Sequence, residues 1–524
     1  MTQRNLRIGV DVGGTNTDGV ILDPTRSSEP GRGIIAWHKV ATTTNPSEGI
    51  NNAITAMFKE SKIQPDDVAS VTIGTTHFIN AVVEMDRARL AKVAIMRLCG
   101  PFSRGVPPCV DWPPQLQRLM MAYQCFVVGG LEVDGSLISD IDEDQIRKEA
   151  EIIKEKGIKS IVVNGIFSPV DVVYRQEERA AEIIEQVHPD ADIVISKDFA
   201  NLGFLERENA AILNASILSF ARKTIAEFTL AISQLHLKCP VFITQNDGTI
   251  LLASQASKLP IRTFSSGPTN SMRGAAFLTQ NEIKEAMMVV DVGGTTTDVG
   301  LLLANGFPRQ AAAFSEVSGV RTNFSYPDVR SIGLGGGSIV RKHADGSMTI
   351  GPDSLGYQLP QRAIVFGGNT TTATDYTVLA DPSSGIGDRS LVLKAGLDED
   401  LARFKSLIKK MLERAIDTMK TSADNTPVLL VGGGAVFDEL IGASKVVKPQ
   451  WSGVANAIGA ATARVSGVVD TIESTERKTT SEVMGEISKR AIQKAVDNGA
   501  SEDTVQVVEM DHLPLQLSLP LCQS

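Results

Sequence analysis

The chain has 524 residues, of which 42% are hydrophobic and 21% are charged, and its formal net charge is −10. This length allows two or more domains with sizeable cores, while the acidic balance without a basic block excludes the usual nucleic-acid footprint. Residues 1–7 contain no signal-type apolar segment and no run of 18 apolar residues follows, so we expect a cytoplasmic protein without membrane contact. The five cysteines form no Cys-x-x-Cys pair, which excludes the common zinc and disulfide frameworks.

The first predicted element is a strand over residues 6–10, followed by the octapeptide Asp11-Val-Gly-Gly-Thr-Asn-Thr-Asp18 and a second apolar run. Asp291-Val-Gly-Gly-Thr-Thr-Thr-Asp298 repeats this octapeptide at seven of its eight positions, again between apolar runs. Each copy therefore predicts a strand, a tight turn and a strand. In such a turn the glycines let backbone N–H groups approach phosphate oxygens, the Thr and Asn side chains add donors, and the leading Asp can hold a magnesium ion through water.

Other interpretations compete with this phosphate-binding turn. One copy alone could be an ordinary hairpin, but two near-identical copies favour a shared ligand. A P-loop would require Gly-x-x-x-x-Gly-Lys-Ser/Thr, which does not occur. A strand over 427–431 precedes Gly432-Gly-Gly434, yet Phe437 occupies the third glycine position of a dinucleotide fingerprint. This strand, turn and expected helix (435–441) suit contact with a nucleoside instead.

Alternating helices and strands occupy the rest of the chain. The pattern predicts helices over 143–156, 175–187 and 206–236, and strands over 160–164, 193–196 and 240–244, the last of which is expected to begin the second half. Beyond residue 468 it predicts a helix over 481–498 and a strand over 504–509. The alternation implies mixed sheets with helices on their faces, an α/β fold. The last residues, 513–524, contain no clear element, which suggests a truncated or separately encoded part of a longer architecture.

The two Asp-x-Gly-Gly-Thr hairpins and the late Gly-Gly-Gly-Ala loop resemble the actin-like ATPase superfamily. Within it, the chain is similar to the hydantoinase A/oxoprolinase family, in particular to its shorter single-subunit members. The resemblance covers about residues 5–465 and is carried, in the family's order, by Gly74-Thr-Thr76, Asn80-Ala81, Glu84, Glu206-Arg-Glu208, Leu213-Asn-Ala215, Ser266-Gly-Pro268, Asp291–Asp298, Gly333–Ser338, Thr374-Asp375 and Gly432–Gly434.

This resemblance implies duplicated actin-like, ribonuclease H-like domains that flank an ATP cleft. We expect the first half and family N-terminal domain over 1–200, the second half over 201–467, and a helix-strand extension over 468–524. The implied cofactors are ATP and Mg²⁺. Asp11 and Asp291 would be the catalytic residues and metal ligands, one orienting the metal and the other positioning or deprotonating the nucleophile. The implied phosphate-binding residues are Gly13, Gly14, Thr15, Asn16, Gly293, Gly294, Thr295 and Thr296, and those for adenosine are Gly432, Gly433, Gly434 and Asn456. Asp18 and Asp298 are expected to hold the turns through bonds to the backbone.

The substrate side follows from the same resemblance, which places the loop after residue 73 in the cleft. Thr75, Thr76 and Asn80 are the candidates for holding a substrate carbonyl or carboxylate. His77 could be a general base or a hydrogen-bonded structural residue. Two further segments have two interpretations each. Gly335–Ser338 could be an anion nest, which we favour, or a flexible hairpin, and Thr374-Asp375 could cap a helix or contact substrate.

The leading functional hypothesis is an ATP-dependent hydrolase, or its kinase subunit, that opens a cyclic amide such as a hydantoin or a 5-oxoproline-like lactam. An unstrained amide resists water, and phosphorylation of its oxygen removes that resistance. The alternatives are a small-molecule kinase or ATP-dependent carboxylase subunit, and a non-catalytic actin-like regulatory ATPase. The resemblance also implies a second hydrolase subunit as partner, and the sequence leaves room for a homo-oligomer.

Overall fold

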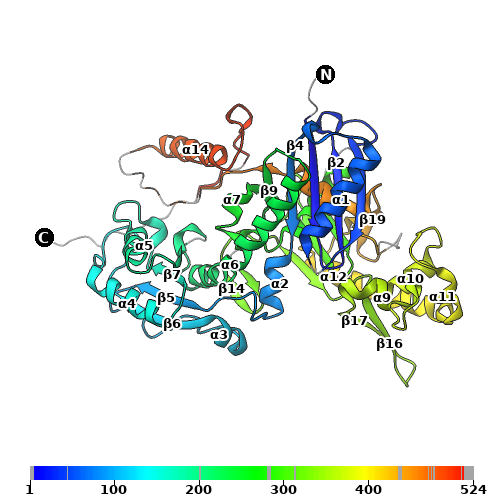
Figure 1. The fold of residues 1–524 in the computed structure, drawn as a ribbon, viewed down its shortest axis with the longest axis horizontal. Helices are drawn as coiled ribbons and strands as arrows, with labels where there is room; N and C mark the ends of the chain where they lie inside the picture. Colours follow the sequence, from blue (N-terminus) through cyan, green and yellow to red (C-terminus); the bar gives the residue numbers. More distant parts are fainter. Residues whose placement is uncertain are drawn as a thin grey trace.

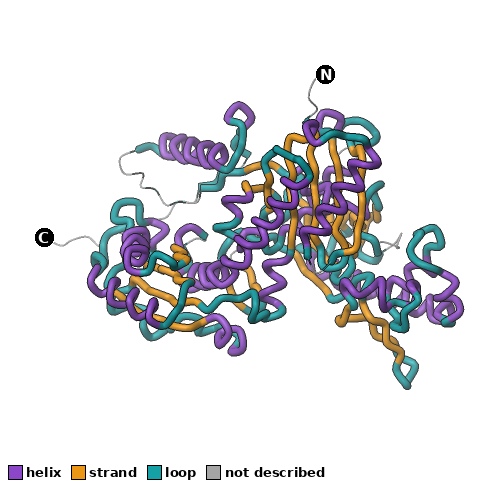
Figure 2. Tube along the Cα trace, viewed as in Figure 1, coloured by secondary structure: helices purple, strands orange, loops and turns teal. Residues whose placement is uncertain are grey.

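The computed structural model describes residues 5–43, 45–199, 202–279, 285–311, 314–434, 440–469, 471, 473, 475, 478–508 and 510–512. Figure 1 shows two sheet-containing halves side by side, with a separate α/β unit beside the first half and a smaller helical unit beside the second. Figure 2 shows that helices cover the faces of both central sheets. The expected α/β class is confirmed.

The first central sheet has seven strands in the order β20-β10-β9-β4-β1-β2-β3. β1 pairs antiparallel with β2, which pairs antiparallel with β3, whereas β4 and β9 continue parallel to β1. The strands are β1 Leu6–Val12, β2 Asn16–Leu22, β3 Ile34–Ala41, β4 Val68–Thr75, β9 Val241–Thr244, β10 Thr249–Leu252 and β20 Arg464–Val465, with helices α1 Pro46–Ser61 and α2 His77–Val83.

The second central sheet repeats this topology. Its order is β15-β12-β11-β18-β19, with β12 and β15 antiparallel and β18 and β19 parallel in the same positions. The strands are β11 Met287–Val292, β12 Thr297–Leu302, β15 Val329–Ile332, β18 Thr426–Val431 and β19 Ala443–Val447, with helix α12 Leu401–Met419. Helix α13 Ala455–Thr462 follows this sheet in the chain but packs on β1 and β2 of the first sheet. Two copies of one strand arrangement establish the duplicated actin-like fold that the twin octapeptides predicted.

One boundary differs from the sequence expectation. The strand expected to open the second half at 240–244 is β9, and it pairs with β4 in the first sheet, with Val71 opposite Val241. A parallel strand can join its sheet from a distant part of the chain because its connection crosses over a sheet face. The first repeat therefore runs from β1 through α8 (Ser266–Thr279), and the division at residue 200 stays a prediction.

An inserted unit interrupts the first repeat between β4 and β9. Its sheet is wholly parallel, in the order β6-β5-β7-β8. The elements are β5 Val93–Leu98, α3 Pro114–Met120, β6 Met121–Val127, α4 Glu143–Glu155, β7 Ser160–Gly165, α5 Gln176–Val187, β8 Asp192–Ile195 and the long α6 Phe204–Gln234. Five of these confirm helices or strands that the sequence predicted: α4, β7, α5, β8 and α6.

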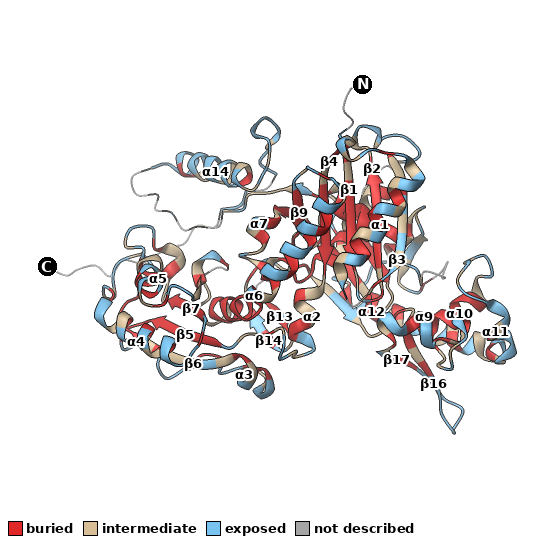
Figure 3. Ribbon diagram, viewed as in Figure 1, coloured by how far each residue is buried: buried red, intermediate tan, exposed pale blue. Residues whose placement is uncertain are grey.

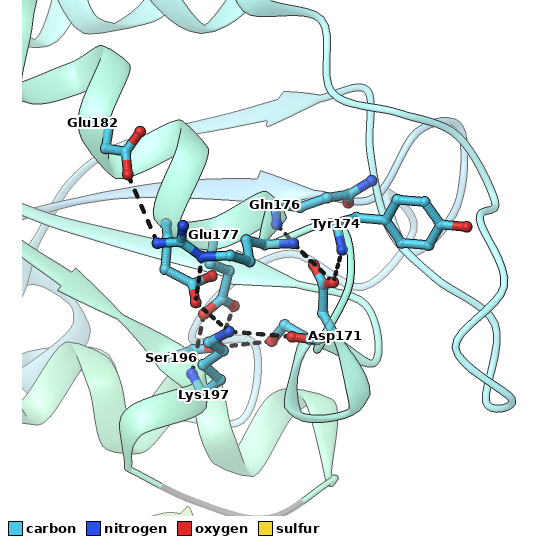
Figure 4. Close-up of polar contacts among 10 residues, drawn as sticks. Asp171, Tyr174, Gln176, Glu177, Glu182, Ser196 and Lys197 are labelled. Carbon is cyan, nitrogen blue, oxygen red and sulfur yellow. Dashed lines mark hydrogen bonds and ion pairs between the residues drawn. The ribbon is translucent and has the colours of Figure 1, made fainter. Parts of the chain in front are cut away.

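Buried polar residues fix this insert. Figure 4 shows Asp171 accepting bonds from the backbone N–H groups of Tyr174 and Gln176 at 2.8 and 2.7 Å, which caps α5, while Glu177 accepts from the Ser196 hydroxyl at 2.6 Å. Arg97 of β5 and Glu208 of α6 form an ion pair at 2.6 Å, and neither side chain is exposed. Because a lone buried charge is costly, this pair ties the insert to α6.

Two short helices join the halves behind the hairpins. α8 and α13 cross so closely that a Cβ at Gly274 would overlap the carbonyl oxygen of Ala455, and one at Gly459 would overlap the carbonyl oxygen of Asn270. Only glycine permits this backbone contact. Figure 3 shows that the strands β1, β2 and β4 of the first sheet are largely buried.

The remaining elements complete the two halves, and several of them, among them α10 and β14, contribute buried residues to the cores. They are α7 Ala253–Ala256, β13 Ser315–Val317, β14 Val320–Thr322, β16 Ser338–Lys342, β17 Met348–Ser354, α9 Leu359–Arg362, α10 Ala373–Ala380, α11 Arg389–Lys394 and α14 Thr480–Asp497. The helix predicted over 481–498 is confirmed as α14. The strand predicted over 504–509 is wrong over its described part, since residues 502–504 form a 3-10 turn and residues 505–508, with Val507 and Val508 exposed, form no strand. Residue 509 lies outside the described residues. Most of the expected helix 435–441, and the segment 513–524, fall outside the described residues.

Candidate active site between two hairpins

The two octapeptide turns face each other and touch. The hydroxyl of Thr15, at the tip of the β1–β2 hairpin, lies 3.1 Å from that of Thr295, at the tip of the β11–β12 hairpin. These threonines hold the same place in their octapeptides, so the contact relates the halves by an approximate twofold axis. A ligand held by both turns would meet both hydroxyls at once.

Asp11 lies at the end of β1, opposite Asp18 on β2 and beside Gly74 on β4. Its side chain is buried and its Oδ2 accepts a bond from the Asn456 amide at 3.2 Å, while its Oδ1 makes no hydrogen bond of ordinary geometry with the described residues. Burial, together with the charge of Asp18, raises the pKa of Asp11 to about 7. A carboxylate with such a buried oxygen is suited to a cation or a proton.

Asp291 occupies the matching position at the end of β11. It is also buried, and burial raises its pKa. Gly432 follows β18, the next strand, with φ +85°, and a Cβ there would come 2.5 Å from Asp291 Oδ1. The first glycine of the Gly432–Gly434 loop is thus required for close approach to the second carboxylate. The adenosine roles of this loop and of Asn456 stay predictions.

The hairpin backbones partly support themselves. The N–H of Gly13 donates to the carbonyl of Asn16 at 3.0 Å, and the N–H of Gly293 donates to that of Thr296 at the same distance. These two N–H groups therefore close the turns. The phosphate-binding role of the octapeptide residues stays a prediction, resting on Thr15, Thr295 and the remaining turn residues.

The anion nest favoured for Gly335–Ser338 is wrong. The N–H groups of Gly336 and Gly337 donate to the carbonyls of Gly293 and Gly294 at 2.9 and 2.7 Å, and that of Gly335 donates to Ser338 at 2.8 Å. The N–H groups of Gly336 and Gly337 thus support the second hairpin, and those of Gly335 and Ser338 close the loop itself. Thr374 extends this support by donating to the Gly336 carbonyl at 2.8 Å.

Of the two interpretations of Asp375, the helix cap is confirmed. Its carboxylate accepts bonds from the backbone N–H and the hydroxyl of Thr372 at 2.7 and 2.9 Å, at the start of α10. Asp18 and Asp298 differ from expectation, since neither holds the backbone of its turn. Asp18 pairs with Lys39 at 2.6 Å, and Asp298 accepts a bond from the Ser331 hydroxyl.

The candidate substrate residues follow β4. Thr75 is buried, and its backbone carbonyl accepts a bond from Ser266, at the start of α8, at 3.1 Å. Thr76 packs against Gly267, where a Cβ would come 3.1 Å from its methyl group. Asn80 lies one turn into α2, its backbone N–H bonded to the Thr76 carbonyl. Burial lowers the pKa of His77, which keeps the imidazole neutral.

Three residues near the carboxylates were not found from the sequence. Lys39 reaches Asp18 because β3 places the two opposite each other, a pairing that only the sheet register reveals. Asn270 and Ser271 lie in the first turns of α8, and both are buried. A Cβ at Gly74 would overlap Asn270 Nδ2 and come 2.7 Å from Asp11 Oδ1, so Asn270 and Asp11 meet around this glycine.

The donor set fits a magnesium ion held partly through water. Within the described ranges, no group of three or more His, Cys, Asp and Glu side chains is spaced to hold a metal by itself. Magnesium instead keeps several waters and takes one or two carboxylates together with phosphate oxygens. Asp11 and Asp291 are carboxylates of the kind that would hold such an ion, and their role as metal ligands stays a prediction.

Two related domains, each with a glycine hairpin and a buried carboxylate aimed at the space between them, define the class of actin-like ATPase folds. The chain belongs to the hydantoinase/oxoprolinase family: residues 7–188 match the model of the hydantoinase/oxoprolinase N-terminal region, and residues 207–382 match that of hydantoinase/oxoprolinase.

Several known proteins are similar to this chain. The caprolactamase subunit alpha of Pseudomonas jessenii is 22% identical over 79% of this chain and 60% of its own length. An uncharacterized protein of Methanocaldococcus jannaschii is 22% identical over 80% of this chain and 62% of its own. The chain thus spans about three fifths of the length of these curated relatives.

Two solved structures share the fold. A nucleotide-free acetone carboxylase superimposes with a TM-score of 0.71 at 19% identity, covering 95% of this chain and 78% of that one. The ATP-dependent caprolactamase of Pseudomonas jessenii gives 0.69 at 19% identity, covering 94% and 77%. Separately, no helix in the described ranges is long and apolar enough to cross a membrane.

Proposed function

We propose that the protein is an ATP-dependent hydrolase, or the phosphorylating subunit of one, that opens a cyclic amide. The observation that carries this proposal is the contact between Thr15 and Thr295, with Asp11 and Asp291 buried behind them. Two equivalent turns that close on one another are suited to hold the phosphates of one ATP from both sides. The caprolactamase and 5-oxoprolinase relatives support the cyclic amide as substrate class.

The proposed reaction begins when the amide oxygen attacks the γ-phosphorus of ATP and ADP leaves. Water then adds to the ring carbon, the carbon–nitrogen bond breaks as the nitrogen takes up a proton, and a second water releases phosphate. Mg²⁺ would neutralise charge on the phosphates. In this chain Thr15 and Thr295 bind the phosphates, one carboxylate orients the cation, and the other positions or deprotonates the nucleophile. Thr75, Thr76 and Asn80 hold the ring.

A carboxylase subunit is the second candidate. The acetophenone carboxylase gamma subunit is 25% identical over 51% of this chain, and the acetone carboxylase beta subunit is 24% identical over 64%. The oxygen of a ketone enol can accept the γ-phosphoryl group of ATP as an amide oxygen can, so the same site is suited to either substrate. The names of these relatives as subunits also support a second chain as partner.

Phosphate release by the purified protein with Mg²⁺ and ATP separates these functions. It should be screened against hydantoin, 5-oxoproline, caprolactam and acetone, with and without bicarbonate. We expect a ring amide to stimulate phosphate release and to be opened, with the opened product detected by chromatography. Stimulation by a ketone alone would replace the hydrolase with the carboxylase. Slow turnover that no small molecule changes, even with a co-purified partner, would contradict both.

A further inference from the structure

Three buried polar atoms beside the inner-strand carboxylates make no hydrogen bond with the residues that the structure describes. They are Oδ1 of Asp11, Oδ1 of Asn270 and Oγ of Ser271, each with almost no accessible surface. Asn270 and Ser271 are 1% and 0% exposed. Buried polar atoms in native proteins are nearly always paired with protein, water or an ion. Three such atoms on neighbouring side chains therefore indicate a binding site for a polar ligand, water or an ion.

The backbone holds these side chains in place. Asn270 donates through Nδ2 to the Thr244 hydroxyl at 3.1 Å, which orients the carboxamide. The crossing of α8 and α13 fixes the Asn270 carbonyl against Gly459. The site is thus built before any ligand arrives, as metal sites with supported ligands are.

Each of the two helix residues faces one of the two inner-strand carboxylates. Asn270 meets Asp11 around Gly74, and Ser271 lies close enough to Asp291 to lower the pKa of that carboxyl while making no hydrogen bond of ordinary geometry. The unpaired atoms are carboxylate, amide and hydroxyl oxygens. These are the hard oxygen donors that bind Mg²⁺ or its water shell.

We propose that Asn270 and Ser271 are positioning residues that hold the water shell of a divalent cation bound between Asp11 and Asp291. The inference rests on the proposed function, because it concerns the same cleft. The amide oxygen of Asn270 and the hydroxyl of Ser271 accept hydrogen bonds from cation-bound water. Their side chains thereby fix where the cation lies relative to the two carboxylates.

Direct binding of Mn²⁺, measured by electron paramagnetic resonance with and without ADP, tests the assignment without relying on turnover. Asn270→Ala and Ser271→Ala should each weaken Mn²⁺ binding about 10-fold or more, as loss of outer-sphere partners does elsewhere. Asn270→Asp keeps an oxygen acceptor and should retain the affinity. Asn51→Ala is the matched control, because Asn51 also has an unpaired buried amide oxygen but lies on α1.

Thermal unfolding supplies a second readout that separates this role from a structural one. The Ser271 hydroxyl makes no hydrogen bond of ordinary geometry with the described residues, so Ser271→Ala should unfold close to the wild-type temperature while losing Mn²⁺ affinity. Wild-type Mn²⁺ affinity in both alanine variants would overturn the inference and leave the proposed function intact. If the wild-type protein binds Mn²⁺ through these residues but never hydrolyses ATP in the presence of a ring amide, the inference stands and the proposed function is wrong.

Discussion

The two hairpins are nearly identical in sequence but are supported differently. On the first, Asp18 pairs with Lys39 and Thr15 is buried. On the second, Asp298 accepts a bond from the Ser331 hydroxyl. Hydrogen bonds to the turn carbonyls hold both turns, because Thr42 donates to Gly13 and Thr15 at 2.8 and 2.9 Å, and the N–H groups of Gly336 and Gly337 donate to Gly293 and Gly294. The difference is therefore a charged pair beside the first turn and a neutral hydroxyl beside the second. Repetition of the motif preserves the turn and its carbonyl partners but leaves the charge beside it free to differ.

The largest expected effect comes from the residues that the halves share. Asp11→Ala and Asp291→Ala should each lower ATP turnover about 10²–10³-fold, because each removes a charge aimed at the phosphates and the cation. Steady-state phosphate release measures the loss, and circular dichroism should show a retained fold. Turnover within a factor of three of wild type in both variants would rule out the two-hairpin site.

Alanine substitutions at the equivalent glycines of the two hairpin tips should affect turnover differently. A Cβ at Gly294 would come 2.6 Å from Thr15 Cβ, whereas one at the equivalent Gly14 would have Thr295 Oγ1 at 3.8 Å as its nearest neighbour. We therefore expect Gly294→Ala to lower turnover about tenfold, or ~1.4 kcal/mol, by forcing the tips apart. Gly14→Ala is the control and should stay near wild type. Equal losses in the two variants would mean that the tips do not close as described.

The difference in charge support should appear as a pH dependence of stability. Burial raises the pKa of Asp298 from 3.8 to about 7. The folded state then binds more protons than the unfolded state between these values, so this carboxyl stabilises the fold below pH 4 and loses that contribution as the pH rises through 7. Between pH 4 and pH 8 the free energy of unfolding of Asp298→Asn should rise by about 1–2 kcal/mol relative to that of the wild type. Urea unfolding at both pH values checks this, and an unchanged difference would contradict it.

The smallest expected effect concerns Lys39. Lys39→Met leaves Asp18 buried without its cation and should destabilise the fold by about 1 kcal/mol, less than for a fully buried pair because the Lys39 side chain is 33% exposed. Ser331→Ala, at the matching position of the second hairpin, should cost less. Urea unfolding at pH 7 compares the two, and a larger loss for Ser331→Ala would reverse the assignment of charge support.

The octapeptides could be predicted from the sequence because a short local pattern specifies a turn. The residues around the inner-strand carboxylates could not. Asn270 and Lys39 reach the carboxylates only through a helix crossing and a strand register, which are set by long-range packing. The strand predicted over 504–509 failed for a related reason, since strand-like composition alone does not supply a pairing partner, and residues 505–508 form no strand. The glycines at 335–337 suggested phosphate binding, yet the N–H groups of Gly336 and Gly337 donate to carbonyls of the second hairpin and that of Gly335 donates to Ser338.

The backbone contact between α8 and α13 has a mechanical consequence. With Gly274 and Gly459 pressed against opposing carbonyls, the two helices cannot slide along each other without a clash. Any motion that parts the hairpin tips must then be a rotation about this crossing. Asn270 lies at this crossing, whereas Thr15 and Thr295 lie at the tips of the hairpins. Such a rotation would move the two threonines apart while Asn270 keeps its position relative to both helices.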